Sequence, residues 1–219
     1  MEQLCKAAML HILIALGSMV LAFLWGGIPV GYIIVQQIKS VDFRKYGSGN
    51  IGATNVRRIL GSGWFFGVLT LDAVKGALPV LITGFIPGFD SLEIILVAAS
   101  TIGGNLFSPW LGFKGGKGVS TSIGVFFVLA PLPVIASIVV FSVALLTLNY
   151  MSLACIAGAI AFPFAIFSAE SIRGIGHNQY LLLFSIVVAI TLTAMERANI
   201  ARVFSRTEPK FFTRLRRTD

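Results

Sequence analysis

Long apolar stretches alternate with short polar segments along most of the chain. A helix of about 20 apolar residues crosses the hydrocarbon core of a bilayer, so this pattern predicts an all-α membrane protein, a bundle of about seven transmembrane helices. The expected spans are residues 12–35, 65–85, 92–107, 119–130, 133–148, 152–168 and 180–194. The fourth is the shortest, and the Pro-Leu-Pro step at 131–133 that follows it is equally compatible with a kink or a re-entrant turn.

The composition is that of a polytopic membrane protein rather than a soluble domain. Hydrophobic residues make up 56% of the chain and charged residues 12%, with a mean hydropathy of +0.89. No repeat of fixed period divides the sequence, and we expect residues 1–219 to form a single integral-membrane domain. The first apolar stretch runs well past Trp25 without a small-residue cleavage site, so we expect it to remain as a span. Cys5 and Cys155 lie far apart, and we expect no disulfide between them.

The positive residues sort to one side of this topology. Cytoplasmic loops carry an excess of Lys and Arg, and 14 of the 17 such residues share one side: Lys39, Arg44, Lys45, Arg57, Arg58, Lys114, Lys117, Arg197, Arg202, Arg206, Lys210, Arg214, Arg216 and Arg217. We therefore expect the N-terminus outside and the C-terminus in the cytoplasm. Sorting by membrane side is unlike the groove-lining face of a nucleic-acid-binding protein, so we expect no nucleic acid as a partner.

Residues 202–219 form a basic tail, which this topology places in the cytoplasm. Basic residues that follow a last span usually fix its orientation and lie on anionic membrane lipid. Specific binding of a partner protein is the less favoured alternative.

Two glycine-rich polar segments, residues 46–58 and 112–121, lie on the expected cytoplasmic side. Glycines let the backbone approach a ligand closely, and exposed N–H groups beside hydroxyls, amides and fixed positive charge suit an anion such as phosphate. The charges are those of Arg57, Arg58, Lys114 and Lys117. Alternatively, the glycines only permit tight turns and helix packing while the cations set the topology. Two such loops on one face favour a phosphate site.

Neither loop matches a nucleotide-binding motif in the required context. Residues 47–52 spell G-x-G-x-x-G, but they follow a membrane span instead of a strand, and Asp72 downstream lies in an apolar segment. The Gly115-Gly-Lys-Gly118 segment has Leu111 in place of the first P-loop glycine, and Gly118 in place of the Ser or Thr that holds magnesium. We expect neither a dinucleotide nor a nucleoside triphosphate to bind.

Asp72 and Lys75 are three residues apart in the second expected span and therefore share one helix face. Charges at membrane depth are costly, so Lys75 either points into a cytoplasmic cavity or forms an ion pair that holds spans together. Asn105, near the end of the third span, either lines the same cavity or bonds to another helix.

Glu196, Arg197 and Asn199 follow the last span, at the depth where a water-soluble substrate meets a lipid chain. His11 and His177 fall near the outer face of the expected topology. The candidate proton acceptors on the cytoplasmic side are therefore Glu196, a group of the substrate, or an assisted hydroxyl such as Ser48.

Four segments together resemble a known family. They are Ser48-Gly-Asn-Ile-Gly-Ala-Thr-Asn55, Asp72-x-x-Lys75-Gly76, Gly112-Phe-Lys-Gly-Gly-Lys-Gly-Val119 and Arg197-Ala-Asn-Ile200. In order and spacing, across residues 30–204, the chain resembles the bacterial integral-membrane glycerol-3-phosphate acyltransferases, the acyl-phosphate-dependent PlsY family. The resemblance implies a seven-span enzyme of the cell inner membrane whose active site faces the cytoplasm. It implies transfer of a fatty acyl group from acyl phosphate to the sn-1 hydroxyl of glycerol 3-phosphate, which yields lysophosphatidic acid and phosphate for phospholipid biosynthesis. Neither a metal, a cofactor nor acyl-CoA is implied.

The resemblance also suggests the site residues. The expected catalytic residues are Ser48, Lys114, Glu196 and Asn199, and the expected substrate-binding residues are Asn50, Thr54, Asn55, Arg58, Lys75, Asn105, Gly115, Gly116, Lys117, Gly118 and Arg197. Family members usually carry His at positions 105 and 196. If Glu196 replaces a histidine base, its neighbour Arg197 weakens it, and a substrate phosphate is then the alternative proton acceptor. The competing hypothesis is a catalytically silent relative that binds or transports an anionic phosphorylated metabolite.

Overall fold

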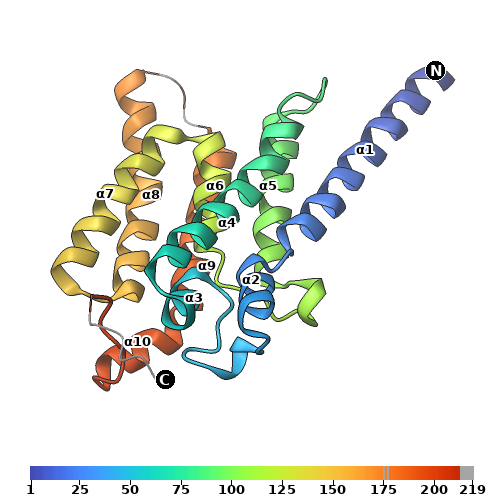
Figure 1. Ribbon diagram of the computed structural model, residues 1–219. Coiled ribbons are helices and arrows are strands. Elements are labelled where there is room, and N and C mark those ends of the chain that lie inside the picture. Colours follow the sequence, from blue (N-terminus) through green and yellow to red (C-terminus); the bar gives the residue numbers. More distant parts are fainter. Residues whose placement is uncertain (175, 177, 213–219) are drawn as a thin grey trace.

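The structure is a computed structural model that describes residues 1–174, 176 and 178–212. Every regular element in this described part is helical (Figure 1): α1 Glu2–Gly26, α2 Val30–Lys39, η1 Phe43–Lys45, α3 Ala53–Leu60, α4 Ser62–Thr83, α5 Ser91–Leu106, η2 Pro109–Leu111, α6 Val119–Leu129, α7 Pro131–Leu148, α8 Met151–Arg173, α9 Gln179–Met195 and α10 Arg197–Phe204. The all-α prediction is confirmed for these residues. His177 and the tail residues Arg214, Arg216 and Arg217 lie outside them.

Five helical stretches in the described residues are long and apolar enough to cross a membrane: Cys5–Lys39, Ser62–Thr83, Ser91–Leu111, Pro131–Leu148 and Met151–Arg173. A sixth results if Gln179–Met195 and Arg197–Phe204, which meet at a bend of 49°, are one broken span. The expected fourth span corresponds to α6, a shorter apolar helix of 11 residues. The number of seven crossings and the membrane sides of the two termini stay predictions.

The first expected span is interrupted in the structure. α1 ends at Gly26 and α2 begins at Val30, because Pro29 lacks the backbone N–H that a continuous helix would need. The carbonyl of Ile28, which lies in the break, accepts a hydrogen bond from Nζ of Lys75 at 2.8 Å. The break in this span therefore provides a buried lysine with one of its acceptors.

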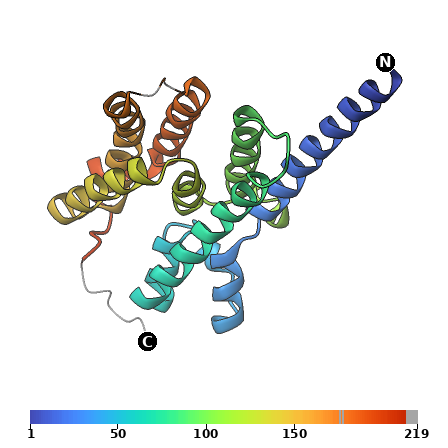
Figure 2. The same ribbon diagram turned by 90° about the horizontal axis from the view of Figure 1, so that it is seen from above.

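Glycines allow the helices of the bundle to cross closely. A Cβ atom on Gly76 of α4 would collide with the carbonyl of Thr121 in α6, and one on Gly124 would collide with the carbonyl of Ala73. Small residues permit such close approach of membrane helices. Viewed from above, α6 lies in the middle of the bundle, with α7, α8 and α9 on one side and α4 and α5 on the other (Figure 2).

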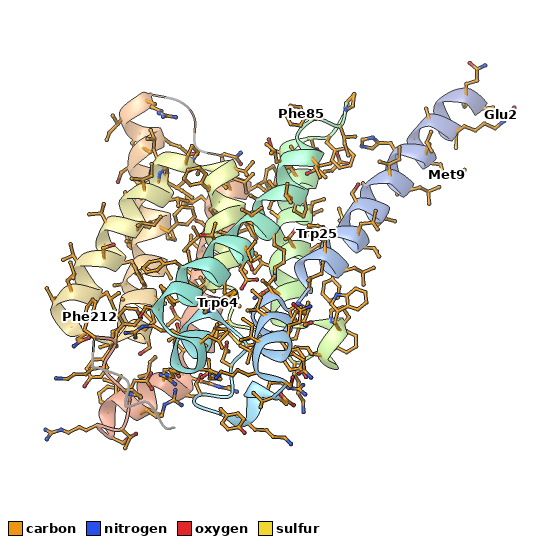
Figure 3. All side chains as sticks on the ribbon, viewed as in Figure 1. Glu2, Met9, Trp25, Trp64, Phe85 and Phe212 are labelled. Atoms are coloured by element: carbon orange, nitrogen blue, oxygen red, sulfur yellow. The ribbon has the colours of Figure 1, made fainter. Side chains whose placement is uncertain are left out.

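The short elements η1, α3 and α10 lie at the end of the bundle opposite the N-terminus, which we call the basic end (Figure 1). Side-chain nitrogen atoms gather there, whereas Glu2 and Phe85 lie at the other end (Figure 3). The first glycine-rich loop leads into α3, and the second joins η2 to α6. Cys5 and Cys155 are free, as expected.

Candidate active site

A cavity of about 300 Å³ lies between the two glycine-rich loops and helices α4 and α6–α9. Part of its wall is polar and includes Ser48, Arg58, Lys117 and Asn199. The rest is largely apolar, with Phe65, Leu69, Phe126, Phe141, Phe162, Val188 and Leu192 among its residues. A concave site with few polar groups and a long apolar wall suits an amphiphilic molecule.

The first loop is folded around the side chain of Asn55, which is 1% exposed. Its Oδ1 accepts a hydrogen bond from the N–H of Ser48 at 3.2 Å, and its Nδ2 donates to the carbonyl of Tyr46 at 3.1 Å. Gly47 has a φ of 61°, and a Cβ there would collide with Oδ1 of Asn55. Asn55 therefore holds Ser48 at the cavity wall.

A second amide shapes the same loop. Oδ1 of Asn50 accepts a hydrogen bond from the N–H of Gly52 at 2.8 Å, which is an Asx turn directly before α3. Thr54 and Arg58 are four residues apart on α3, and both line the cavity. The preceding Arg57 instead donates from Nη1 to the carbonyl of Phe211 at 2.6 Å. The helical register thus separates two adjacent arginines.

The second loop packs against the end of α5. The N–H of Gly116 donates to the carbonyl of Asn105 at 2.9 Å, and the N–H of Gly115 donates to that of Leu106 at 3.1 Å, so the loop satisfies carbonyls that the helix end leaves open. A Cβ on Gly115 would collide with the carbonyl of Asn105. Gly116, Lys117 and Gly118 line the cavity.

Lys117 forms an ion pair with Glu196, with Nζ 2.5 Å from Oε2. The same oxygen accepts a hydrogen bond from Nδ2 of Asn199. The side chain of Glu196 is only 4% exposed, and all three residues line the cavity. The carboxylate at 196 therefore joins the second loop to α10 and fixes both an ammonium and an amide at the wall.

Lys75 belongs to a buried network behind the cavity wall. Its Nζ donates to the carbonyl of Ile28 at 2.8 Å and to Oδ1 of Asn105 at 3.1 Å, and it lies 2.8 Å from Oδ1 of Asp72. Asp72 and Asn105 line the cavity, whereas Lys75 does not. Asp72 and Lys75 both belong to α4, so their ion pair lies within one helix, and the two hydrogen bonds of Nζ connect α4 to the break between α1 and α2 and to α5.

The structure does not bring every expected site residue to the cavity wall. Ser48, Asn50, Thr54, Asn55, Arg58, Asn105, Gly116, Lys117, Gly118, Glu196 and Asn199 line it, whereas Lys75, Lys114, Gly115 and Arg197 do not. Lys114 and Arg197 are both exposed. Lys117, rather than the adjacent Arg197, is the cation in contact with Glu196.

Two residues at the site were not identified from the sequence. Nε of Arg202 lies 2.6 Å from Oε2 of Glu208, and Nη2 of Arg202 also donates to Oδ1 of Asn199. Oε1 of Glu208 lies 3.7 Å from Nη2 of Arg58, and Glu208 lines the cavity. The available signal was that Glu208 is the one acidic residue between Glu196 and Asp219, in an otherwise basic tail.

Burial affects the charge of the site. It lowers the pKa of Arg58, because a buried guanidinium is less well solvated, and the nearby Arg202 lowers it further while Glu208 acts in the opposite direction. In the described part of the chain, no three His, Cys, Asp or Glu side chains are grouped as a metal site would require. The anchoring groups at this wall are thus arginine, lysine, amide and hydroxyl groups.

The fold and the cavity together define an integral-membrane protein with a site for a ligand that is anionic at one end and apolar along the rest. Comparison with known proteins shows the family to which the chain belongs. The family described as glycerol-3-phosphate acyltransferase matches residues 16–206, and the chain belongs to this family.

Individual relatives agree with this placement. The glycerol-3-phosphate acyltransferase of Syntrophotalea carbinolica is 37% identical over 192 residues, covering 87% of this chain and 94% of the relative. That of Geotalea daltonii is 40% identical over 195 residues, with the same coverage of both chains.

Two solved structures share the fold. The crystal structure of PlsY (YgiH), an integral membrane glycerol 3-phosphate acyltransferase, in its glycerol 3-phosphate form has a TM-score of 0.82 at 36% identity and covers 90% of this chain and 95% of its own. The lysophosphatidic acid form gives a TM-score of 0.78 at 34% identity, with coverage of 90% and 94%.

Proposed function

We propose that this chain transfers a fatty acyl group from acyl phosphate to the sn-1 hydroxyl of glycerol 3-phosphate, as a step of phospholipid biosynthesis. One observation carries the proposal beyond family membership. Ser48, Arg58, Lys117 and Asn199, from segments far apart in the sequence, line one cavity whose remaining wall is largely apolar. Both substrates are phosphates, and one carries a long alkyl chain, so such a wall matches the pair.

The polar residues have different roles in binding the substrates. Arg58 and Lys117 supply fixed positive charge for the two phosphate groups, and the glycine backbone of both loops allows close approach. Lys114, exposed on the second loop, and Arg197, exposed at the start of α10, are available to meet a phosphate at the basic end outside the cavity. The acyl chain lies along the apolar residues of α4 and α7–α9.

The reaction depends more on orienting the two substrates than on activating either of them. An acyl phosphate is a mixed anhydride: the sn-1 oxygen attacks the carbonyl carbon, the bond from that carbon to the phosphate oxygen breaks, and an ester bond forms. We assign stabilisation of the carbonyl oxygen to Ser48 and Asn199. The hydroxyl proton passes to the departing phosphate, because the Glu196 carboxylate already accepts from Lys117 and Asn199 and serves to orient them.

We place the protein in the cell inner membrane with the basic end toward the cytoplasm. Lys114, Lys117, Arg197 and Arg202 belong to loops and helices at this end, whereas Lys6 lies near the start of α1 and Arg173 in the last turn of α8. This asymmetry supports the orientation, because cytoplasmic segments carry the excess of positive charge.

The experiment is a direct assay of the purified chain in mild detergent. Palmitoyl phosphate and glycerol 3-phosphate are supplied, phosphate release is followed, and lysophosphatidic acid is detected by mass, with palmitoyl-CoA as the control donor. Product from acyl phosphate alone is expected. A folded sample that gives no product would contradict the proposal and favour a catalytically silent relative that binds a phosphorylated metabolite.

A further inference from the structure

Glu208 is a buried carboxylate between two arginines. Its side chain is 4% exposed, Oε2 lies 2.6 Å from Nε of Arg202, and Oε1 lies 3.7 Å from Nη2 of Arg58. The two arginines come from different parts of the chain, Arg58 from α3 and Arg202 from α10. A buried carboxylate is costly unless it is paired. The two arginines therefore make it possible for Glu208 to be buried here.

The backbone around Glu208 is fixed on both sides. The N–H groups of Thr207 and Glu208 donate to the carbonyl of Arg202 at 2.8 and 3.0 Å. Further on, the N–H of Phe211 donates to the carbonyl of Asn149 at 2.8 Å, in the turn between α7 and α8. Arg57 binds the carbonyl of Phe211 and lies over its ring at 4.0 Å. The segment 205–212 is thus a strap from α10 to α3 and to the α7–α8 turn.

The side chains form a continuous polar path along the cavity wall. Glu196 binds Lys117 and Asn199, Asn199 accepts from Arg202, and Arg202 pairs with Glu208, which in turn faces Arg58. Arg202 itself does not line the cavity, whereas Glu208 and Arg58 do. Arg202 therefore lies behind the cavity wall and holds two residues of that wall, Asn199 and Glu208, in place.

We propose that Glu208 is a positioning residue that holds the Arg58 guanidinium where the phosphate of glycerol 3-phosphate binds. The proposal rests on the proposed function. Arg58 and Arg202 repel each other, and the shared carboxylate offsets that repulsion. Arg58 has five N–H donors, and its contact with Glu208 uses one edge of the group. We assign the phosphate to glycerol 3-phosphate because the strap lies at the basic end, from which the water-soluble substrate enters.

The test uses Glu208→Gln, which keeps the shape and removes the charge, beside Asp42→Asn as a matched control. Asp42 also pairs with an arginine, Arg44, at 2.7 Å, but both side chains are more exposed and neither lines the cavity. E208Q is expected to raise the KM of glycerol 3-phosphate about tenfold or more, because the buried negative charge that faces Arg58 is lost, and to change kcat and the KM of acyl phosphate less. D42N is expected to behave as wild type.

A double-mutant cycle with Arg58→Gln separates positioning from general destabilisation. If Glu208 acts through Arg58, the R58Q/E208Q variant has the same KM for glycerol 3-phosphate as R58Q alone. The proposal would be overturned if the two changes raised this KM independently, so that their factors multiplied in the double variant. It would also be overturned by an unchanged KM in E208Q, or by a rise confined to the KM of acyl phosphate. If E208Q does not fold, Glu208→Asp and Arg202→Lys replace it, and both are expected to raise the same KM by less.

A second readout distinguishes failure of this inference from failure of the proposed function. Absence of turnover in wild type would count against the acyltransferase, and inorganic phosphate then serves as the probe. Phosphate is expected to raise the melting temperature of wild type and D42N but not that of E208Q. Equal stabilisation of all three proteins, or of none, would overturn the role of Glu208.

Discussion

The ammonium of Lys117 lies 2.5 Å from the carboxylate of Glu196, although 79 positions separate them in the sequence. The contact joins the second glycine-rich loop to the N-terminal end of α10. It also means that a cation expected to hold phosphate is paired with a carboxylate of the protein in the structure. An incoming phosphate shares or displaces that partner.

Replacing Glu196 separates its two possible roles. Glu196→Gln keeps one hydrogen-bonding oxygen but cannot accept a proton from the substrate at neutral pH. If Glu196 orients Lys117 and Asn199, we expect kcat to fall by no more than about tenfold, since one charge-assisted contact becomes neutral. A fall of about a thousandfold or more in steady-state phosphate release would instead identify Glu196 as the general base.

Glu196→His is the companion change, because the family resemblance in the sequence led us to expect His at this position. An imidazole removes the fixed negative charge that faces Lys117, so we expect a lower KM for the phosphate-bearing substrates. An unchanged KM in the same assay would indicate that Lys117 is already available to substrate in the wild-type protein.

Ser48→Ala and Asn199→Ala are expected to reduce kcat by about a hundredfold or more, because each removes a donor assigned to the reacting carbonyl. Lys114→Ala is expected to raise KM more than it lowers kcat, since its side chain is exposed and outside the cavity wall. Size-exclusion profiles and melting temperatures should match wild type. Two of the three variants at near wild-type rate would contradict the site assignment.

Gly115→Ala tests the packing of the second loop on α5. The added Cβ would collide with the Asn105 carbonyl, and relieving such a clash costs about 1–3 kcal/mol. We expect a lower melting temperature and, because Lys117 moves with the loop, lower activity. Gly63→Ala is the matched control: its Cβ meets nothing within 4 Å, so stability should be equal or slightly higher.

The buried pair of Asp72 and Lys75 is expected to be strongly coupled. Lys75→Met leaves the carboxylate of Asp72 buried without its cation, at a cost of about 3–5 kcal/mol. The double variant Asp72→Asn/Lys75→Met removes both charges and should recover a large part of that loss. Thermal unfolding in detergent measures both. A double variant less stable than either single variant would argue against the pair as the reason for the cost.

Properties that depend on residues close together in the sequence could be predicted from the sequence alone. Apolar length predicted the helices, and the loops that carry Ser48 and Lys117 were expected to converge and do line one cavity. Arg197 was expected to influence Glu196, but adjacent residues at the start of a helix point in different directions, whereas Asn199, three positions on, faces Glu196.

The long-range partners were not predictable in the same way. No local pattern places Lys117 on Glu196, Lys75 on the carbonyl of Ile28, or Glu208 between Arg58 and Arg202. Each of these contacts depends on how separate helices pack. The part of the site that sequence reasoning missed is therefore the part built by packing at the basic end.

The brevity of α6 affects where the two substrates meet. A helix of 11 residues rises only about 16 Å, roughly half of a hydrocarbon core of about 30 Å. We therefore expect the second glycine-rich loop, which ends where α6 begins, to lie below the level of the lipid headgroups. A polar substrate would then have to enter to this depth from the basic end, while the acyl donor stays in its leaflet. The lipid product then forms with its chain already among its neighbours, and no separate insertion step is needed.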